Sequence, residues 1–259
     1  MTRLTRLFPM AIGLLLGLLA LYPPEWLRLL GPFRHAGMAV LVYILLTGFV
    51  ALLIASNLPA DVKMAPTQAP LPPEMAALAS EYQTLGFVPA CPPQEVGIAP
   101  PALVQAFVHE SARVYGTVFR TGTIPARIAF DFFSLIADGR GGLSSGAERG
   151  GAVLPAGPGS LSQILPGASV TQLFAAHLRA LDFLRLRGLS AQAVSAATFE
   201  ADFRAGLARQ RRNFLAAPLR NAATAIWRTA TRTTPHLGAI ETQRVARRQI
   251  GFLLTGARG

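Results

Sequence analysis

Lysine and cysteine are almost absent from this chain of 259 residues, in which Lys63 is the one lysine and Cys91 the one cysteine. A folded region without lysine cannot supply the phosphate-binding lysine of a P-loop, the strand lysine of a protein kinase or the Schiff-base lysine of a pyridoxal-phosphate enzyme. A single cysteine excludes all-cysteine zinc sites, C-x-x-C redox pairs, iron–sulfur clusters and an intrachain disulfide. We therefore expect no cofactor and an inert Cys91 thiol.

Acidic residues are also scarce. The chain has 13 of them and 24 lysines and arginines, which gives a net charge of +11. The imbalance is greatest between Glu200 and Gly259, where 11 arginines accompany three acidic residues. Dense arginine is typical of a surface that meets anionic lipid, nucleic acid or an acidic protein, although a solvated helix face has the same composition. The residues that we expect to bind lipid or a partner are Arg204, Arg209, Arg211, Arg212, Arg220, Arg228, Arg232, Arg244, Arg247 and Arg248.

Lipid is the preferred partner of these arginines, because attraction of about 1 kcal/mol per basic residue near a membrane requires no special geometry. A membrane protein complex is the other partner that we consider. No RNP, KH or zinc-finger pattern accompanies the charge, which argues against nucleic acid.

Long uncharged runs dominate the N-terminal part of the chain, and the run at 36–56 is long enough to cross a bilayer as a helix of about 31 Å. Arg3 and Arg6 precede a second run at 7–22, a pattern that also fits a signal peptide. That run ends in bulky residues where a signal peptidase needs small ones. We therefore expect a transmembrane helical hairpin over 1–56, with spans at about 7–22 and 36–56.

The charges that flank these spans give a weak indication of sidedness. Arg3, Arg6 and Lys63 would lie on one side, and Arg28 and Arg34 on the other. Since basic residues favour the cytoplasmic side, we expect both termini in the cytoplasm and the protein in a bacterial inner membrane. The C-terminal domain would then be cytoplasmic.

The rest of the chain is predicted to be an α+β domain held on a proline-rich linker. Residues 57–73 contain five prolines and should form an extended spacer before a domain at 74–259. A helix is expected from Pro73 to Leu85, with Gly86 as its C-terminal stop.

Alternating apolar residues then predict an antiparallel β-meander over 87–146, with strands near 103–109, 113–119, 126–136 and 141–145. Asp138-Gly139 is a hairpin signal between the last two strands. A glycine-rich surface loop should occupy 146–167, and helices should cover the sheet over 169–254. Their expected bounds are 169–187, 190–217, 219–231 and 237–254.

This part of the sequence resembles a group of uncharacterised bacterial membrane-anchored proteins. The shared pattern is a helix ending in Leu85-Gly86-Phe87, then a meander, then Asp138-Gly139 followed by Ser144-Ser145. The resemblance covers about residues 74–185. It implies the same α+β fold and no established activity.

One motif suggests an enzyme. Residues 142–146 match G-x-S-x-G, and Ser144, Asp182 and His236 occur in the order of an α/β-hydrolase triad. The glycines that follow resemble a hairpin arm more than the strand-to-helix turn that exposes such a serine. The serine hydrolase is therefore the alternative, and the preferred function is a non-enzymatic, membrane-anchored scaffold or interaction protein.

Metal binding has weaker support. His109-Glu110 begins like H-E-x-x-H but has no second histidine one turn later. A joint site of His109, Glu110, Asp131 and His177 would require the fold to gather them. His177, on the apolar side of its helix, is more typical of a hydrogen-bonded core histidine, and we expect no metal. Phe132 and Phe133 point to opposite faces of their strand, so Phe132 should mark where a helix or a partner covers the sheet.

Overall fold

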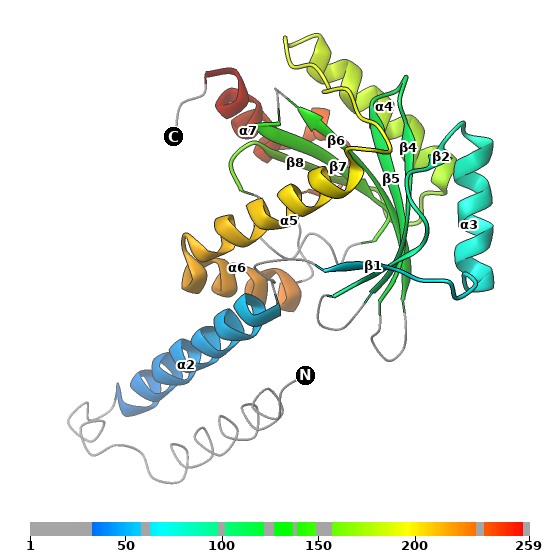
Figure 1. Ribbon diagram of the computed structural model, residues 1–259. Coiled ribbons are helices and arrows are strands. Elements are labelled where there is room, and N and C mark those ends of the chain that lie inside the picture. Colours follow the sequence, from blue (N-terminus) through cyan, green and yellow to red (C-terminus); the bar gives the residue numbers. More distant parts are fainter. Residues whose placement is uncertain are drawn as a thin grey trace.

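The computed structural model describes residues 33–57, 63–97, 102–121, 127–136, 139–148, 157–231 and 236–255. These residues form an α+β fold with an antiparallel-rich sheet of eight strands and six α-helices (Figure 1). The expected first span at 7–22 lies outside the described residues. The described helices are α2 (Arg34–Asn57), α3 (Pro73–Thr84), α4 (Val170–Arg185), α5 (Phe199–Leu215), α6 (Pro218–Thr231) and α7 (Arg244–Thr255), with a short 3-10 helix η3 (Ile240–Thr242).

Helix α2 includes the apolar run predicted to cross a membrane. Ala36–Ala55 is the one described segment that is long and apolar enough to do so, and little of it is buried inside the protein. Its 20 residues correspond to about 30 Å of helix, the thickness of a hydrocarbon core. A second span would have to come from the part of the chain that is not described.

The sheet has the strand order β1-β3-β4-β5-β6-β7-β8, with β2 paired to β4. Its strands are β1 (Met64–Pro66), β2 (Val88–Pro89), β3 (Gln94–Val96), β4 (Ala102–His109), β5 (Val114–Thr121), β6 (Ile128–Ile136), β7 (Gly141–Gly146) and β8 (Ser160–Ile164). The pairs from β4 to β7 are antiparallel, which confirms the predicted meander. Strand β8 is parallel to β7.

Two expectations about loops were wrong. The predicted surface loop at 146–167 contains β8, whose Leu161 and Gln163 are buried, so part of it belongs to the sheet. The predicted spacer contributes β1, which pairs with β3 at the edge of the sheet and shortens the reach of the linker. Both strands are short, and proline or glycine next to them hides the alternation of apolar residues on which the prediction relied.

Helices cover both faces of the sheet. On one face, Phe107, Val118 and Phe132 pack against Tyr82 of α3 and Phe174 of α4. We call this the α4 face; it confirms Phe132 as the mark of a helix-covered surface. Helix α7 extends the same layer through Ile250 and Leu253.

The opposite face, which we call the α5 face, carries Tyr115 and Phe133. Both rings contact Phe199 at the start of α5, and Phe203 continues that contact one turn later. The N-terminal end of α5 therefore packs on the strands of the α5 face. Its other end reaches α6 and α2 (Figure 1).

Two predicted helices were too long at their N-terminal ends. Helix α5 begins at Phe199 instead of near 190, because Ser195 and Thr198 hydrogen-bond with each other and Ala191 pairs with Ile136 of β6. Helix α7 begins at Arg244 instead of 237, because the Gly238 N–H donates to the Ile164 carbonyl at 2.9 Å. In both segments, pairing of the backbone with a strand of the sheet replaces the first turns of the predicted helix.

Candidate functional site

His177 is buried on the α4 face and joins three strands to α4. The Gln163 side chain donates to the Ser145 hydroxyl at 2.8 Å, and Ser145 Oγ lies 2.7 Å from His177 Nδ1. His177 Nε2 lies 3.0 Å from the hydroxyl of Ser134, which donates to the Arg113 carbonyl at 2.8 Å. Burial lowers the pKa of His177 to about 3, so the ring is neutral at physiological pH.

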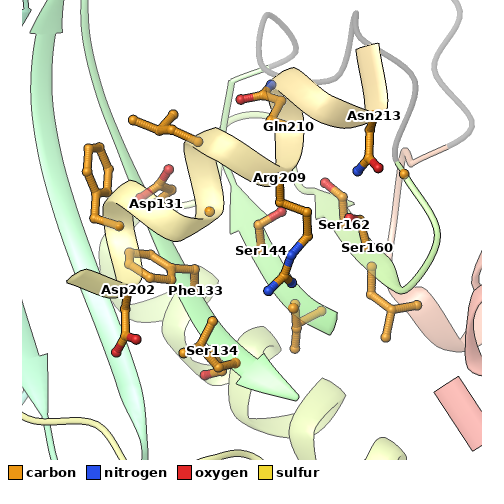
Figure 2. A pocket seen from close by; sticks show the side chains of 18 of the residues that line it. Asp131, Phe133, Ser134, Ser144, Ser160, Ser162, Asp202, Arg209, Gln210 and Asn213 are labelled. Atoms are coloured by element: carbon orange, nitrogen blue, oxygen red, sulfur yellow. The ribbon is translucent and has the colours of Figure 1, made fainter. Parts of the chain in front are cut away.

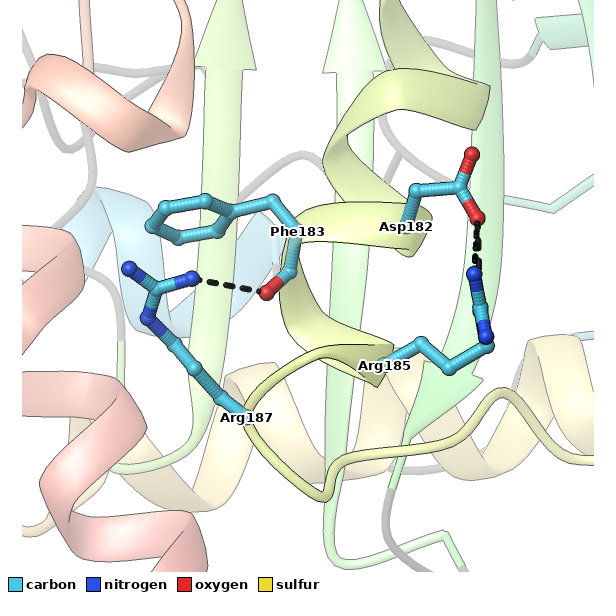
Figure 3. A network of polar contacts seen from close by, with 4 residues as sticks. All are labelled: Asp182, Phe183, Arg185 and Arg187. Carbon is cyan, nitrogen blue, oxygen red and sulfur yellow. Dashed lines mark hydrogen bonds and ion pairs between the residues drawn. The ribbon is translucent and has the colours of Figure 1, made fainter.

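The structure does not gather the predicted Ser–His–Asp triad. Ser144 is exposed on the α5 face, whereas its neighbour Ser145 is completely buried beside His177 on the α4 face. Asp182 lies on the outside of α4, where its carboxylate pairs with Arg185 at 3.3 Å (Figure 3). His236 and Ser144 line a common pocket, but Asp182 is absent from its walls.

The four residues considered for a metal site are also separated. His109 packs its ring between Phe87 and Phe174, and His177 is hydrogen-bonded to serines on the same face. Asp131 lies on the α5 face and accepts a short hydrogen bond from the Thr117 hydroxyl. Within the described ranges, no three His, Cys, Asp or Glu side chains are grouped as metal ligands would be.

A pocket of about 380 Å³ lies between α5 and strands β6, β7 and β8 (Figure 2). Helix α5 contributes residues at spacings of three and four, so a single face of the helix forms one wall. The strands contribute the opposite wall. The polar residues that line it are Thr117, Asp131, Ser134, Ser144, Ser160, Ser162, Asp202, Arg209, Gln210, Asn213 and His236.

Two acidic side chains of this pocket are already hydrogen-bonded. Asp202 accepts from the Tyr115 hydroxyl at 2.7 Å, and burial raises the pKa of Tyr115 to about 12. Asp131 accepts from Thr117, and burial raises the pKa of Asp131 to about 6 even though that hydrogen bond favours the charged form. Asp131 therefore titrates close to neutral pH.

A second candidate surface surrounds the C-terminal half of α2. Ala51 packs with Phe214 of α5 and Ala222 of α6, and Val50, Ile54 and neighbouring Ala55 lie at the edge of this cluster. The N-terminal half of α2 stays exposed, with Tyr43 and Ile44 more than half exposed. Among the described elements, α6 is the one that lies along α2 most extensively (Figure 1).

Helix α6 presents apolar residues on two sides. Ala222 and Ala225 are buried toward the protein, beside Asn221, whose side-chain amide donates to the Asn213 and Phe214 carbonyls. On the outer side, apolar residues recur at spacings of three and four, and Trp227 and Leu219 are 66% and 56% exposed. We call this outer set the α6 stripe; it consists of Leu219, Ala223, Ile226, Trp227 and Ala230.

The predicted arginines do not form one surface. Arg204 pairs with Glu200 at 2.6 Å, and Arg209 lines the pocket. Arg212 and Arg220 are exposed near the junction of α5 and α6, where Phe214 and Ala222 contact α2. Arg211 and Arg228 are partly buried, and each has a partner.

The three arginines of α7 are exposed at another place, because α7 packs on β8 and lies away from α2 (Figure 1). They are Arg244, Arg247 and Arg248. Arg232 lies outside the described residues. The proposed lipid-binding set is therefore divided between two ends of the domain.

Sequence reasoning missed both the pocket and the α6 stripe. The pocket had one local signal, the alternation of Ser160 and Ser162 around Leu161, which places two hydroxyls on one face of a strand. The stripe had a clearer signal in its helical spacing.

Comparisons with known protein families, with curated proteins and with solved structures find no match for this chain. A function must therefore be inferred from the described residues themselves.

Proposed function

We propose that the protein is a membrane-anchored, non-enzymatic interaction protein whose helices α5 and α6 rest on anionic lipid headgroups beside α2. The observation that carries this proposal is the α6 stripe, an exposed apolar helix face next to the helix that is long enough to span a bilayer. An amphipathic helix of this kind buries its apolar face about 5–10 Å into the headgroup boundary.

The identity of the residues supports lipid as the occupant of the stripe. Trp227 is the amphipathic ring that is enriched at membrane interfaces, and Leu219 and Ile226 supply apolar area beside it. Arg220 follows Leu219 directly and reaches the edge of the stripe, where a phosphate would lie. The exposed apolar residues of α2, such as Tyr43 and Ile44, would meet the acyl chains.

The finer arrangement is proposed from the sequence. We propose that residues 7–22 form a second span, that both termini are cytoplasmic and that the membrane is the bacterial inner membrane. Arg212 and Arg220 would then face the leaflet that carries anionic lipid.

Hydrogen exchange on the full chain in nanodiscs tests the contact with lipid. We expect the amides of α6 to exchange more slowly when phosphatidylglycerol is added to phosphatidylcholine. The double variant Arg212→Gln/Arg220→Gln should lose this difference. The matched control Arg247→Gln/Arg248→Gln on α7 should keep it.

Equal exchange of α6 in the two lipid mixtures would contradict the proposal. So would an equal effect of both double variants, because α7 does not lie beside α2.

A further inference from the structure

The pocket between α5 and the sheet has a wall of serine hydroxyls. Ser144 of β7 is the register partner of Ser162 of β8, and Ser160 lies two residues before Ser162 on the same face. All three line the pocket. In the part of the chain that the structure describes, these hydroxyls make no hydrogen bond with protein atoms. They are available to a ligand.

Arg209 brings a positive charge into the same pocket. Its guanidinium is half-buried and donates a short hydrogen bond to the Gly139 carbonyl oxygen, which uses only part of its donor capacity. Burial and the like charge of Arg212 lower the pKa of Arg209. The ion pairs found between described residues do not include Arg209.

The two ends of the pocket differ in polarity, because one end has acidic side chains and the other has hydroxyl and amide groups. Figure 2 shows Asp131, Asp202 and Phe133 at one end, Ser160, Ser162 and Asn213 at the other, and the guanidinium of Arg209 between them. A ligand that satisfied both ends would carry an oxyanion at the serine end and a hydrogen-bond donor at the acidic end.

Gly206 keeps the middle of the pocket open. It lies on the pocket-facing side of α5, between Phe203 and Gln210, and a Cβ atom added there would meet no atom within 4 Å. Glycine inside a helix costs about 1 kcal/mol relative to alanine. Glycine therefore lowers the stability of α5 at the position where a larger side chain would fill the cavity.

We propose that this pocket binds a small phosphate ester with an amine or hydroxyl at its other end. Several hydroxyls, the Asn213 amide and a guanidinium around one point suit the many oxygens of a phosphate better than the two of a carboxylate. The volume of about 380 Å³ is within the usual range for small-molecule sites. The ester could be soluble or could be the headgroup of a phospholipid, and the chemistry recognised is the same.

Calorimetry on the full chain in phosphatidylcholine nanodiscs tests the soluble source. We expect O-phosphoethanolamine to bind, inorganic phosphate to bind more weakly, and ethanolamine alone not to bind. Loss of a hydrogen bond to a charged group corresponds to a weakening of about tenfold or more, which we expect for Arg209→Gln. Arg247→Gln is the matched control and should bind as the parent does.

Two further variants separate binding from folding. Ser144→Ala/Ser162→Ala removes hydroxyls that have no protein partner among the described residues, so it should weaken binding without lowering the melting temperature. Gly206→Leu should abolish binding and leave the fold intact, because leucine favours helix and enters open space.

Nanodiscs that contain phosphatidylethanolamine test the lipid source. If the phosphatidylethanolamine headgroup occupies the pocket, O-phosphoethanolamine should no longer bind to the protein in these nanodiscs. The lipid selectivity of the Gly206→Leu variant should then differ from that of the parent protein. The proposal is overturned if no phosphate probe binds in either membrane, or if the pocket variants bind as the parent does. The contact of α6 with lipid would be unaffected by that result.

Discussion

At the scale of single residues, the hydrogen bonds around His177 fix its protonation. The Ser134 hydroxyl donates to the Arg113 carbonyl, so it must accept from His177 Nε2, which therefore carries the proton. His177 Nδ1 then accepts from Ser145, and Ser145 accepts from Gln163. This assignment gives both ring nitrogens of His177 a hydrogen-bond partner without a charge, which makes His177 a structural link between α4 and the strands.

His177 and Asp131 change the stability of the fold in opposite directions with pH. His177 has its pKa lowered to about 3, so its contribution is complete above the ordinary value of 6.5 and is lost as the pH falls through the range between them. Asp131 has its pKa raised from 3.8 to about 6. Its contribution is complete below 3.8 and is lost as the pH rises through 6.

Replacing Asp131 by Asn should therefore stabilise the protein at pH 8. The gain should be about 1–3 kcal/mol, because the ionised carboxylate no longer has to be buried and the amide oxygen still accepts from Thr117. Near pH 4 the gain should vanish, since the carboxyl group of Asp131 is then mostly neutral in the folded state. Urea unfolding of the full chain in detergent at both pH values measures the difference.

Asp182→Asn is the matched control for this measurement, because Asp182 is exposed and its ion pair with Arg185 lies at the surface. We expect little change in its stability at either pH. A loss of stability for Asp131→Asn at pH 8 would mean that the carboxylate is better compensated than the pocket suggests.

At the scale of secondary-structure elements, α3 is fixed to the sheet by Tyr82. Its ring lies over Gly116 of β5 and contacts Phe107 and Phe132, and its hydroxyl donates to the Asp131 carbonyl at 2.8 Å. A Cβ atom at position 116 would come within 2.1 Å of the Tyr82 ring. The close approach of α3 therefore depends on glycine at this strand position.

Gly116→Ala should destabilise the fold by about 1–3 kcal/mol or more, because the ring is fully buried and has no space to move. Gly146→Ala in β7 is the matched control, since nothing lies within 4 Å of an added Cβ atom there. Urea unfolding of both variants measures the contrast. Similar stability of the two variants would show that α3 can shift to accommodate the methyl group.

Much of the element order could be predicted from local sequence. Ser169 caps α4 in a capping box, and Gly86 has the positive φ of 89° expected of a residue that ends a helix. The meander followed from alternating residues. These features depend on neighbours in the chain, which is why sequence patterns indicate them.

Features that depend on distant partners could not be predicted in the same way. Strand β8 exists because Ser160–Ile164 finds β7 as a parallel neighbour, and the late start of α5 depends on the pairing of Ala191 with Ile136. The pocket combines hydroxyls of β7 and β8 with Arg209 and Gly206 of α5. No spacing in the sequence brings those residues together before the topology is known.

At the scale of the whole molecule, α5 and α6 connect α2, a helix of membrane-spanning length, to the folded domain. The C-terminal half of α2 packs on α6, so the domain is joined to α2 by contact as well as by the linker. Both the α6 stripe and the N-terminal half of α2 carry exposed apolar residues. If α2 spans a bilayer, α6 would lie at the surface of that bilayer. The sheet and its pocket would then lie just outside the membrane.

The depth of Trp227 in a membrane tests this account most directly. The chain has two tryptophans, so Trp26→Phe leaves Trp227 as the single tryptophan, whose emission can be excited selectively. In vesicles, we expect strong quenching by lipids brominated on the upper acyl chain and weak quenching by aqueous iodide. Strong quenching by iodide together with none by the brominated lipids would place α6 in water and contradict the account.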